Sequence, residues 1–406
     1  MAVPVPFECH IADEAVDALR TRLALTRFPD APPGSTWEYG ASLGTMQRIK
    51  EYWQHEFDWR AQEARLNSYE QASVAIDGIG VHYLKVQGKR AIGAPEPMPL
   101  LLVHGWPGSV FEFLDIIDRL TDPARFGGDP ADAFTVIAPS LPGFTFSFAP
   151  HQPRCGVEEM ASMLTRLMTE QLGYERFGAQ GGDWGSFVVS RMASESPELF
   201  TGIHLNMMPL RRDKSWLQNP TPEQRRYADE LDVFLREETG YQWIQGTRPQ
   251  TLAFALNDSP LGLAAWMTEK FQRWTDCNEV PDTAISIDTM LANISLYWFT
   301  ECIGSSFWPY YARHHRAWPI DLTHPIEVPT GYCEFPREIL RPPRSLAEQV
   351  YPDIRRWSVM PAGGHFAAME QPEALASEVQ QFFHDLRHMD QLDDLSVPVL
   401  DELKRA

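Results

Sequence analysis

The stretch GAQGGDWGSFVV, residues 178–189, carries an aspartate at a position suited to nucleophilic chemistry. Its pentapeptide GGDWG puts Asp183 in the G-x-nucleophile-x-G pattern of a sharp strand-to-helix turn. Small flanking residues are needed there because the backbone of the nucleophile is strained and neighbouring chains pass close. A helix starting at Trp184 would aim its positive end at the carboxylate and keep it ionised. The alternative is that Asp183 merely caps that helix.

A second loop is placed to supply hydrogen-bond donors. HGWPGS, residues 104–109, directly follows the apolar run LLLV. The backbone N–H of Trp106 would then pair with that of Trp184 to form an oxyanion hole. Pro107 would fix the loop, and the bond before a proline is where a cis peptide is most readily accommodated. The alternative is a plain turn at a strand end, with a tryptophan in the core.

A histidine late in the chain is a candidate base. His365 lies in GGHFAAMEQPE, residues 363–373, in a glycine-flanked loop after the last apolar strand. An acid must orient its imidazole, and the order nucleophile, acid, histidine is a known one for such triads. After the strand PIEVPTGYC the candidates are Glu334 and Glu338, with Asp353 a weaker third. A structural role is the alternative for any one of the 12 histidines.

An aspartate nucleophile suits a saturated carbon better than an acyl carbon. Attack on an acyl group would give an unstable anhydride, whereas attack on sp³ carbon gives an alkyl ester. Water activated by a histidine–acid pair can hydrolyse that ester while an oxyanion hole holds the tetrahedral intermediate. Epoxides and alkyl halides are the obvious substrates. An opening epoxide develops an alkoxide, and tyrosine, with a pKa of about 10, can protonate it while staying neutral at pH 7.

Strands and helices must bring these loops to one edge of a sheet. From residue 98 onward, continuous apolar runs such as MPLLLVHG and FTVIAPSLPG alternate with helical patterns. This alternation is typical of a wound α/β sheet with parallel strands. The chain is then helical from roughly 208 to 320, and the sheet pattern resumes at PIEVPTGYC and RRWSVMPAGGHF. The helical insert is therefore predicted to form a lid over the carboxyl edge of the strands, where ligands of such sheets bind.

The first 90 residues read as mainly helical, with a hairpin signal at Asp77-Gly78. We therefore expect an N-terminal extension (1–90), a first part of the α/β core (91–207), a helical lid (208–320) and a second part of the core (321–406). The aromatic and methionine side chains of the lid would form the walls of an apolar pocket: Trp243, Phe254, Trp266, Met267, Phe271 and Trp274. The alternative, which is more common at helical spacing, is that they form the core of the lid.

Composition narrows the partners of this 406-residue chain. Its 35 basic and 55 acidic residues give a formal charge of −20, which repels nucleic acid and anionic lipid. The sequence contains no signal peptide and no run of about 18 apolar residues, so no membrane anchor is expected. Five scattered cysteines without a CxxC pair argue against disulfides or zinc and fit a reducing cytoplasm. We expect a soluble cytoplasmic protein with no metal and no cofactor, and the sequence leaves open whether it forms a homo-oligomer.

Four motifs in order, HGWPGS, GGDWGS, FPREIL and GGHFAAMEQPE, resemble those of the epoxide hydrolases of the α/β-hydrolase superfamily, in the microsomal and juvenile-hormone branch. The resemblance runs nearly end to end and includes RTRLALTRFPD…YWQHEFDWRAQEARLN, which is similar to the N-terminal domain of that branch. It implies an α/β-hydrolase fold, with a mostly parallel sheet, a helical lid and an N-terminal extension. It also implies the conversion of a small apolar epoxide and water to a vicinal diol, a reaction of detoxification. The anchoring helix of microsomal members has no counterpart in the sequence.

The resemblance also assigns residues that spacing alone leaves open. The glutamate of the family's FPxE motif falls on Glu338, which favours it over Glu334 as the partner of the histidine. The two lid tyrosines of the family fall on Tyr241 in GYQWIQGTRP and Tyr310 in SSFWPYY, with Tyr311 as a rival for the second position. Two tyrosines facing the nucleophile would pull on the epoxide oxygen while the carboxylate attacks carbon.

Three other functions compete with this interpretation. A haloalkane dehalogenase shares the aspartate and histidine but predicts halide-binding N–H donors in place of paired lid phenols, and the N-terminal stretch argues against it. A non-catalytic binder on the same scaffold would tolerate loss of Asp183, Glu338 or His365, and all three are present. A serine esterase is disfavoured because no G-x-S-x-G follows a strand.

Overall fold

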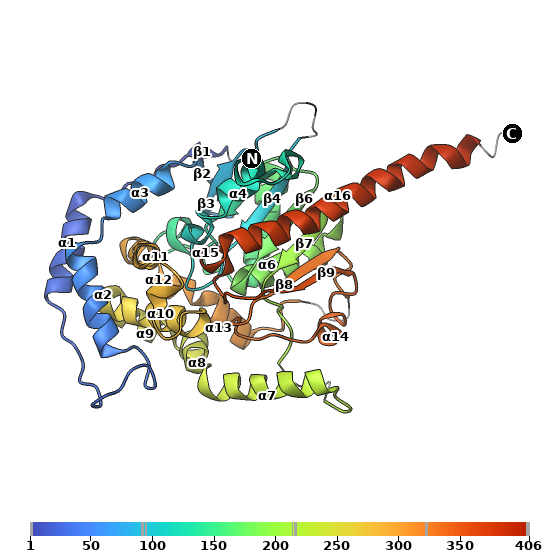
Figure 1. The fold of residues 1–406 in the computed structure, drawn as a ribbon. Helices are drawn as coiled ribbons and strands as arrows, with labels where there is room; N and C mark the ends of the chain where they lie inside the picture. Colours follow the sequence, from blue (N-terminus) through green and yellow to red (C-terminus); the bar gives the residue numbers. More distant parts are fainter. Residues whose placement is uncertain are drawn as a thin grey trace.

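A nine-stranded sheet forms the centre of the described part of the protein (Figure 1). The computed structural model describes residues 3–90, 93, 96–212, 214, 217–320 and 324–402, with side chains up to residue 387. The strand order is β1-β2-β3-β5-β4-β6-β7-β8-β9. The strands are β1 (Val5–Pro6), β2 (Gln71–Ile76), β3 (Ile79–Val86), β4 (Met98–Val103), β5 (Phe134–Pro139), β6 (Phe177–Gly181), β7 (Phe200–Leu205), β8 (Thr330–Glu334) and β9 (Ile354–Val359).

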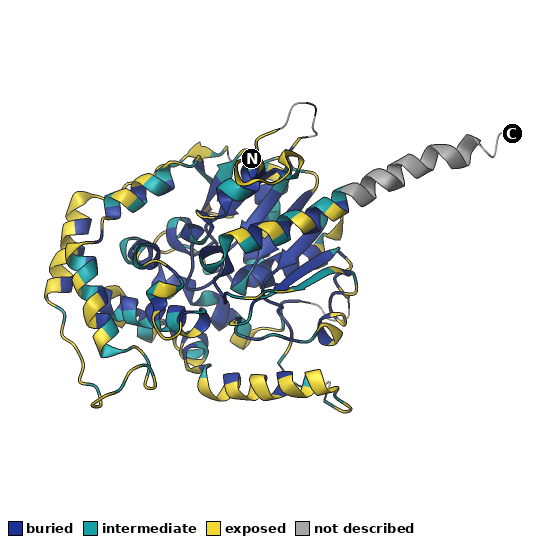
Figure 2. Cartoon of the chain, viewed as in Figure 1, coloured by how far each residue is buried: buried dark blue, intermediate teal, exposed yellow. Residues whose placement is uncertain are grey.

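Six of these strands, β5, β4, β6, β7, β8 and β9, run parallel to one another, whereas β1, β2 and β3 are added at one edge by antiparallel pairing. Every residue of β5 and β6 is buried, so both faces of the middle of the sheet are covered (Figure 2). The helices that cover it include α4 (Ile117–Thr121) packed with α16 (Pro372–Glu402), and α5 (Val157–Arg166) packed with α6 (Asp183–Glu195). The predicted α/β fold with a mostly parallel sheet is confirmed.

A helical lid separates β7 from β8. No strand occurs among the described residues between 208 and 320. The lid helices are α7 (Pro222–Glu237), α8 (Gly240–Thr247), α9 (Pro249–Asp258), α10 (Pro260–Trp274), α11 (Ile287–Thr300), α12 (Ile303–Ser306) and α13 (Trp308–His315). Two short helices, α14 (Arg344–Ala347) and α15 (Ala367–Glu370), lie in the second part of the core.

The N-terminal helices pack against the lid. α1 (Asp13–Ala24) and α2 (Leu43–His55) contact α10, and α3 (Trp59–Asn67) contacts α11, as Figure 1 shows in blue beside yellow and orange. Trp53 of α2 donates from its indole Nε1 to Ser295 Oγ of α11 at 3.0 Å, a buried hydrogen bond. The expected hairpin at Asp77-Gly78 forms β2 and β3, and β3 pairs with β5. The hairpin therefore belongs to the central sheet, although the predicted boundary at residue 90 assigns it to the extension; that boundary stays a prediction.

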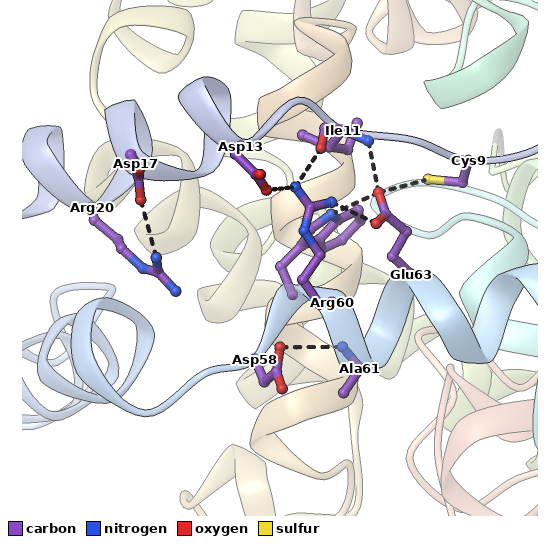
Figure 3. Close-up of polar contacts among 10 residues, drawn as sticks. Cys9, Ile11, Asp13, Asp17, Arg20, Asp58, Arg60, Ala61 and Glu63 are labelled. Atoms are coloured by element: carbon purple, nitrogen blue, oxygen red, sulfur yellow. Dashed lines mark hydrogen bonds and ion pairs between the residues drawn. The ribbon is translucent and has the colours of Figure 1, made fainter.

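A buried glutamate ties the start of the chain to α3 (Figure 3). Glu63 accepts hydrogen bonds from the backbone N–H of Ile11 at 2.7 Å and from the indole of Trp59 at 3.3 Å. Arg60 pairs with the same carboxylate and donates to the carbonyl of Ile11 at 2.6 Å. Because the charge of Glu63 is paired and hydrogen-bonded, its burial is tolerated and the segment before α1 is fixed.

The helices and the cysteines bear on the expectations about a membrane anchor and about disulfide bonds. None of the helices in the described ranges is both long and apolar enough to cross a membrane. The five cysteines are buried and carry free thiols.

Candidate active site

Asp183 occupies a strained turn between β6 and α6. Its backbone φ of 44° lies in the left-handed region that non-glycine residues seldom adopt. α6 begins at Asp183, one residue earlier than expected, and its N-cap is Gly182. Gly185 lets the turn pass close to β4, because a Cβ at that position would lie 1.9 Å from the carbonyl oxygen of Val103. Asp183 is therefore not the capping residue of the helix, and the turn leaves its carboxylate available for other contacts.

The HGWPGS loop meets this carboxylate. The backbone N–H of Trp106 donates to Asp183 Oδ1 at 2.7 Å, and the peptide bond between Trp106 and Pro107 is cis. The second expected donor, the backbone N–H of Trp184, lies in the first turn of α6. A helix leaves the N–H groups of its first turn without carbonyl partners, so this donor is available. The structure therefore brings together the elements that an oxyanion hole requires.

Lid helix α11 holds the same loop from the other side. Asn293 donates from Nδ2 to the carbonyl oxygen of Pro107 at 2.6 Å and accepts from Ser109 Oγ at 2.6 Å. Tyr297 donates its hydroxyl to the carbonyl oxygen of Gly108 at 2.7 Å. These groups are buried, so the loop has a fixed position relative to both the sheet and the lid.

His365 lies between two carboxylates. Its Nδ1 is 2.6 Å from Glu338 Oε1, and its Nε2 is 3.4 Å from Asp183 Oδ2. Because a carboxylate accepts hydrogen bonds, the proton on Nδ1 faces Glu338 and Nε2 points toward Asp183. Of the three acids that the sequence proposes, only Glu338 reaches the imidazole. Glu334 lies near Arg341 at a different hollow, and Asp353 pairs with Arg355 at 2.8 Å.

The two carboxylates set the charge of the histidine. Burial alone would lower the pKa of His365, but the charges of Glu338 and Asp183 together raise this pKa well above its ordinary value. If the negative charge of Asp183 is removed, one of the two causes that keep the imidazolium protonated disappears. The arrangement therefore makes the basicity of His365 depend on the state of Asp183.

Two lid tyrosines lie over the same carboxylate. Tyr241 of α8 and Tyr310 of α13 both line the cavity that contains Asp183, and their ring centroids are 5.6 Å apart. Both rings pack against Trp106. The rival Tyr311 instead stacks between the rings of two other α13 side chains, Trp308 and His315, and does not line this cavity.

Both phenols are kept neutral. Burial and then the charge of Asp183 raise the pKa of Tyr241 above its ordinary value, and burial and then Tyr241 and Asp183 raise that of Tyr310. The hydroxyl oxygen of Tyr241 accepts from Gln242 Nε2 at 2.8 Å, which leaves its proton free to be donated. The hydroxyl of Tyr310 is buried and makes no hydrogen bond of normal geometry in the described part of the chain, although the hydroxyl of Tyr241 and the indole of Trp184 are close enough to affect its pKa. Two neutral phenols therefore line the cavity beside Asp183.

The cavity has a volume of about 430 Å³ and largely apolar walls. Those walls include Phe187, Met207, Trp243 and Trp318. Of the six lid side chains expected to form them, Trp243 does so. The other five do not line it: Phe254 is exposed, Trp266 is half-buried, and Met267, Phe271 and Trp274 are buried. Phe271 packs against Phe366, and Trp274 packs against Trp106 and His365.

Sequence reasoning missed two side chains near the nucleophile. His104 is buried with Nδ1 3.0 Å from the carbonyl oxygen of Gly105, and its Nε2 accepts from the backbone N–H of Leu141 at 3.1 Å. Burial lowers the pKa of His104 to about 4, so its imidazole is uncharged at neutral pH. Its two contacts with backbone atoms fix the position of the loop. Glu112 lines a small second cavity behind Asp183, and burial raises its pKa to about 8. The only feature of the sequence that could have indicated Glu112 is its position four residues after Gly108.

No group of three or more histidine, cysteine, aspartate or glutamate side chains in the described ranges is arranged to hold a metal ion.

Comparison with known proteins identifies relatives over more than nine-tenths of the chain. Residues 4–113 match the family described as epoxide hydrolase N terminus, and residues 98–242 match the α/β-hydrolase fold family. Epoxide hydrolase 1 of Oryctolagus cuniculus is 37% identical over 401 residues, covering 93% of this chain and 88% of that protein. The crystal structure of juvenile hormone epoxide hydrolase from the silkworm Bombyx mori superposes with a TM-score of 0.86 at 32% identity, covering 96% of both chains. The structure of Aspergillus niger epoxide hydrolase gives a TM-score of 0.81 at 30% identity, covering 94% of this chain and 96% of that one.

Proposed function

Because this chain belongs to the epoxide hydrolases with an α/β-hydrolase fold, we propose that it opens its epoxide through a covalent ester on Asp183. The family confirms the predicted reaction, the addition of water to an epoxide, and leaves the dehalogenase and esterase alternatives without support. The residue roles are our proposal. Asp183 is the nucleophile, Tyr241 and Tyr310 are the acids, and His365 with Glu338 is the base.

In the first step Asp183 Oδ2 attacks an epoxide carbon, and the bond from that carbon to the epoxide oxygen breaks. Oδ1 stays on the N–H of Trp106 at 2.7 Å and becomes the carbonyl oxygen of the ester. The leaving oxygen is a strong base that takes a proton from Tyr241 or Tyr310. Both phenols are neutral before the reaction because of their burial beside a carboxylate. Each is therefore able to donate at the moment when charge develops on the oxygen.

In the second step water adds to the ester carbonyl. The ester has removed the charge of Asp183, so the pKa of His365 falls and its Nε2 proton passes to the phenolate formed in the first step. The neutral Nε2 can then take a proton from water. Glu338 holds the imidazolium through the 2.6 Å contact at Nδ1. The N–H groups of Trp106 and Trp184 stabilise the negative oxygen of the tetrahedral intermediate. When the intermediate collapses, the diol leaves with the former Oδ2 and the second proton of the water, and the oxygen of the water stays in the carboxylate of Asp183.

One observation supports this scheme above the others. The carboxylate of Asp183 contacts a backbone N–H through one oxygen and lies 3.4 Å from His365 through the other, and two buried phenols line the same cavity. A serine hydrolase has no use for the paired phenols, and a dehalogenase needs halide donors in their place. The substrates in this proposal are a largely apolar epoxide and water, and the cytoplasmic location expected from the cysteines belongs to the same proposal.

The test is a single turnover in ¹⁸O-labelled water with enzyme in excess over styrene oxide. The proposal expects the label in the peptide that contains Asp183 and an unlabelled diol. Label found in the diol alone would overturn the covalent route. His365→Gln should in addition accumulate the ester, seen as added substrate mass on that peptide, and the double variant His365→Gln/Asp183→Ala is the control that should carry none.

A further inference from the structure

The substrate cavity carries positive charge that the proposed reaction does not use. Arg212 and Arg313 line it together with Asp183, which is the sole acid among the described lining residues. The chain as a whole has a formal charge of −20. Two arginines in one cavity are therefore a local concentration of charge opposite in sign to that of the whole chain. The remaining wall residues are mostly apolar. The cavity therefore has an acid and two phenols at its catalytic end and guanidinium groups elsewhere in its lining.

These guanidinium groups have weak partners. Arg212 donates from Nη1 to the amide oxygen of Gln242 at 3.2 Å and lies 4.8 Å from the ring of Phe234. Arg313 lies 4.1 Å above the ring of Trp318. Within the described ranges neither forms an ion pair with a carboxylate. Both therefore keep N–H donors available for a ligand, since a guanidinium group has five.

A nearby arginine shows the contrast. Arg316, three residues after Arg313, points outside this cavity and pairs with Glu159 at 2.7 Å. Among the described residues, Arg316 outside the cavity thus pairs with a carboxylate, whereas Arg212 and Arg313 inside it do not. Lone cations in a partly desolvated cavity are unfavourable unless something compensates them.

The charges are also close enough to oppose one another. Burial, followed by the charges of Arg212 and Arg211, lowers the pKa of Arg313 to about 10. Burial likewise lowers the pKa of Arg212, against the opposing effects of Tyr241, Tyr227, Tyr310 and Asp183. A ligand anion between Arg212 and Arg313 would relieve this repulsion. A carboxylate fits best, because its two oxygens match the fork of a guanidinium group.

We propose that the cavity selects epoxides that carry a carboxylate, with Arg212 and Arg313 binding the carboxylate while the epoxide lies at Asp183. This inference rests on the proposed function of Asp183. The apolar walls formed by Phe187, Met207 and Trp318 would contact the hydrocarbon that joins the two groups. A neutral epoxide fits the same walls and lacks only the charge-assisted hydrogen bonds.

The test compares two substrates that differ only in charge, 10,11-epoxyundecanoate and its methyl ester. For the intact chain we expect kcat/KM to be about 10- to 100-fold higher for the acid, the size of a charge-assisted hydrogen bond to a desolvated group. Arg313→Gln and Arg212→Gln should each reduce this acid-to-ester ratio toward one. Arg316→Gln, which removes an equal charge outside the cavity, should leave the ratio unchanged.

Inhibition provides a second readout that needs no epoxide on the ligand. Undecanoate should inhibit the hydrolysis of styrene oxide competitively, and methyl undecanoate should do so at least 10-fold less well, by the same reasoning. Arg313→Gln should remove that difference. Turnover of styrene oxide and of the methyl ester with no preference for the acid would overturn the carboxylate site and leave the proposed function intact. Failure to hydrolyse any epoxide would overturn both.

Discussion

Gly105 is the residue whose enlargement most directly tests the geometry of the site. A Cβ at Gly105 would lie 2.3 Å from both Cβ and Oδ1 of Asp183, whereas ordinary contact begins at 3.4 Å. Gly105→Ala therefore forces the carboxylate and the loop apart by about 1.1 Å, the difference between those two distances. The contacts of Asp183 with Trp106 and His365 cannot both survive that shift. A misplacement of about 1 Å typically costs on the order of 10²-fold in rate, so ester formation should slow by about that factor.

Rapid-quench measurement of ester formation with styrene oxide would give this rate directly. The overpacking should cost about 1–3 kcal/mol of stability, so the variant should still fold, and thermal unfolding would confirm it. Gly44→Ala is the matched control, because a Cβ at Gly44 in α2 meets nothing within 4 Å. A folded Gly105→Ala protein that forms the ester at the wild-type rate would refute the contact between the loop and Asp183.

Three further perturbations address the acids, the base and the N-terminal helices. Replacing Tyr241 and Tyr310 together by Phe should slow diol formation by at least about 10²-fold, the usual contribution of acid catalysis, and wild-type rates would mean that the phenols only pack. Glu338→Gln removes the largest cause that raises the pKa of His365. His365 stops acting as a base when the pH falls below its pKa, so a lower pKa should move the acid limb of the pH profile of single-turnover ester hydrolysis to lower pH. An acid limb at the wild-type pH or at a higher pH would contradict this. Trp53→Phe leaves a buried hydroxyl of α11 unpaired, so urea unfolding should show a loss of about 1–3 kcal/mol, and an unchanged midpoint would show that the hydrogen bond contributes nothing.

The positions of the loops around Asp183 could be predicted because each loop follows a strand whose apolar pattern is visible in the sequence. A continuous apolar run ending at a glycine indicates a buried parallel strand, and parallel strands present their carboxyl ends at one edge. The loops at Trp106, Asp183 and His365 therefore had to meet, and the observed contacts join them. The choice among the three acids did not follow in this way, because Glu334 and Glu338 leave the same strand and only the path of the loop decides which one reaches the imidazole.

The lid was harder to predict for a different physical reason. Helical spacing identifies the apolar face of a helix, but it does not say whether that face meets another helix or a cavity. Phe271 and Trp274 of α10 share such a face, and both are buried against Phe366 of the core, whereas Trp243 of α8 lines the cavity. Arg212 and Arg313 were missed for another reason, because they lie far apart in the sequence and only the fold brings both to one cavity.

The N-terminal helices reach the catalytic loop without touching the substrate cavity. Trp53 of α2 hydrogen-bonds Ser295 of α11, and two residues earlier on α11 Asn293 holds the carbonyl of Pro107. Trp106 directly precedes Pro107, and its backbone N–H donates to the carboxylate of Asp183. Each of these groups is buried, so a displacement of α11 cannot be absorbed by solvent and must be passed on to the loop. A region that contributes no group to the cavity is therefore connected through one helix to the backbone N–H that contacts Asp183, which gives a physical reason for an enzyme of this family to carry it.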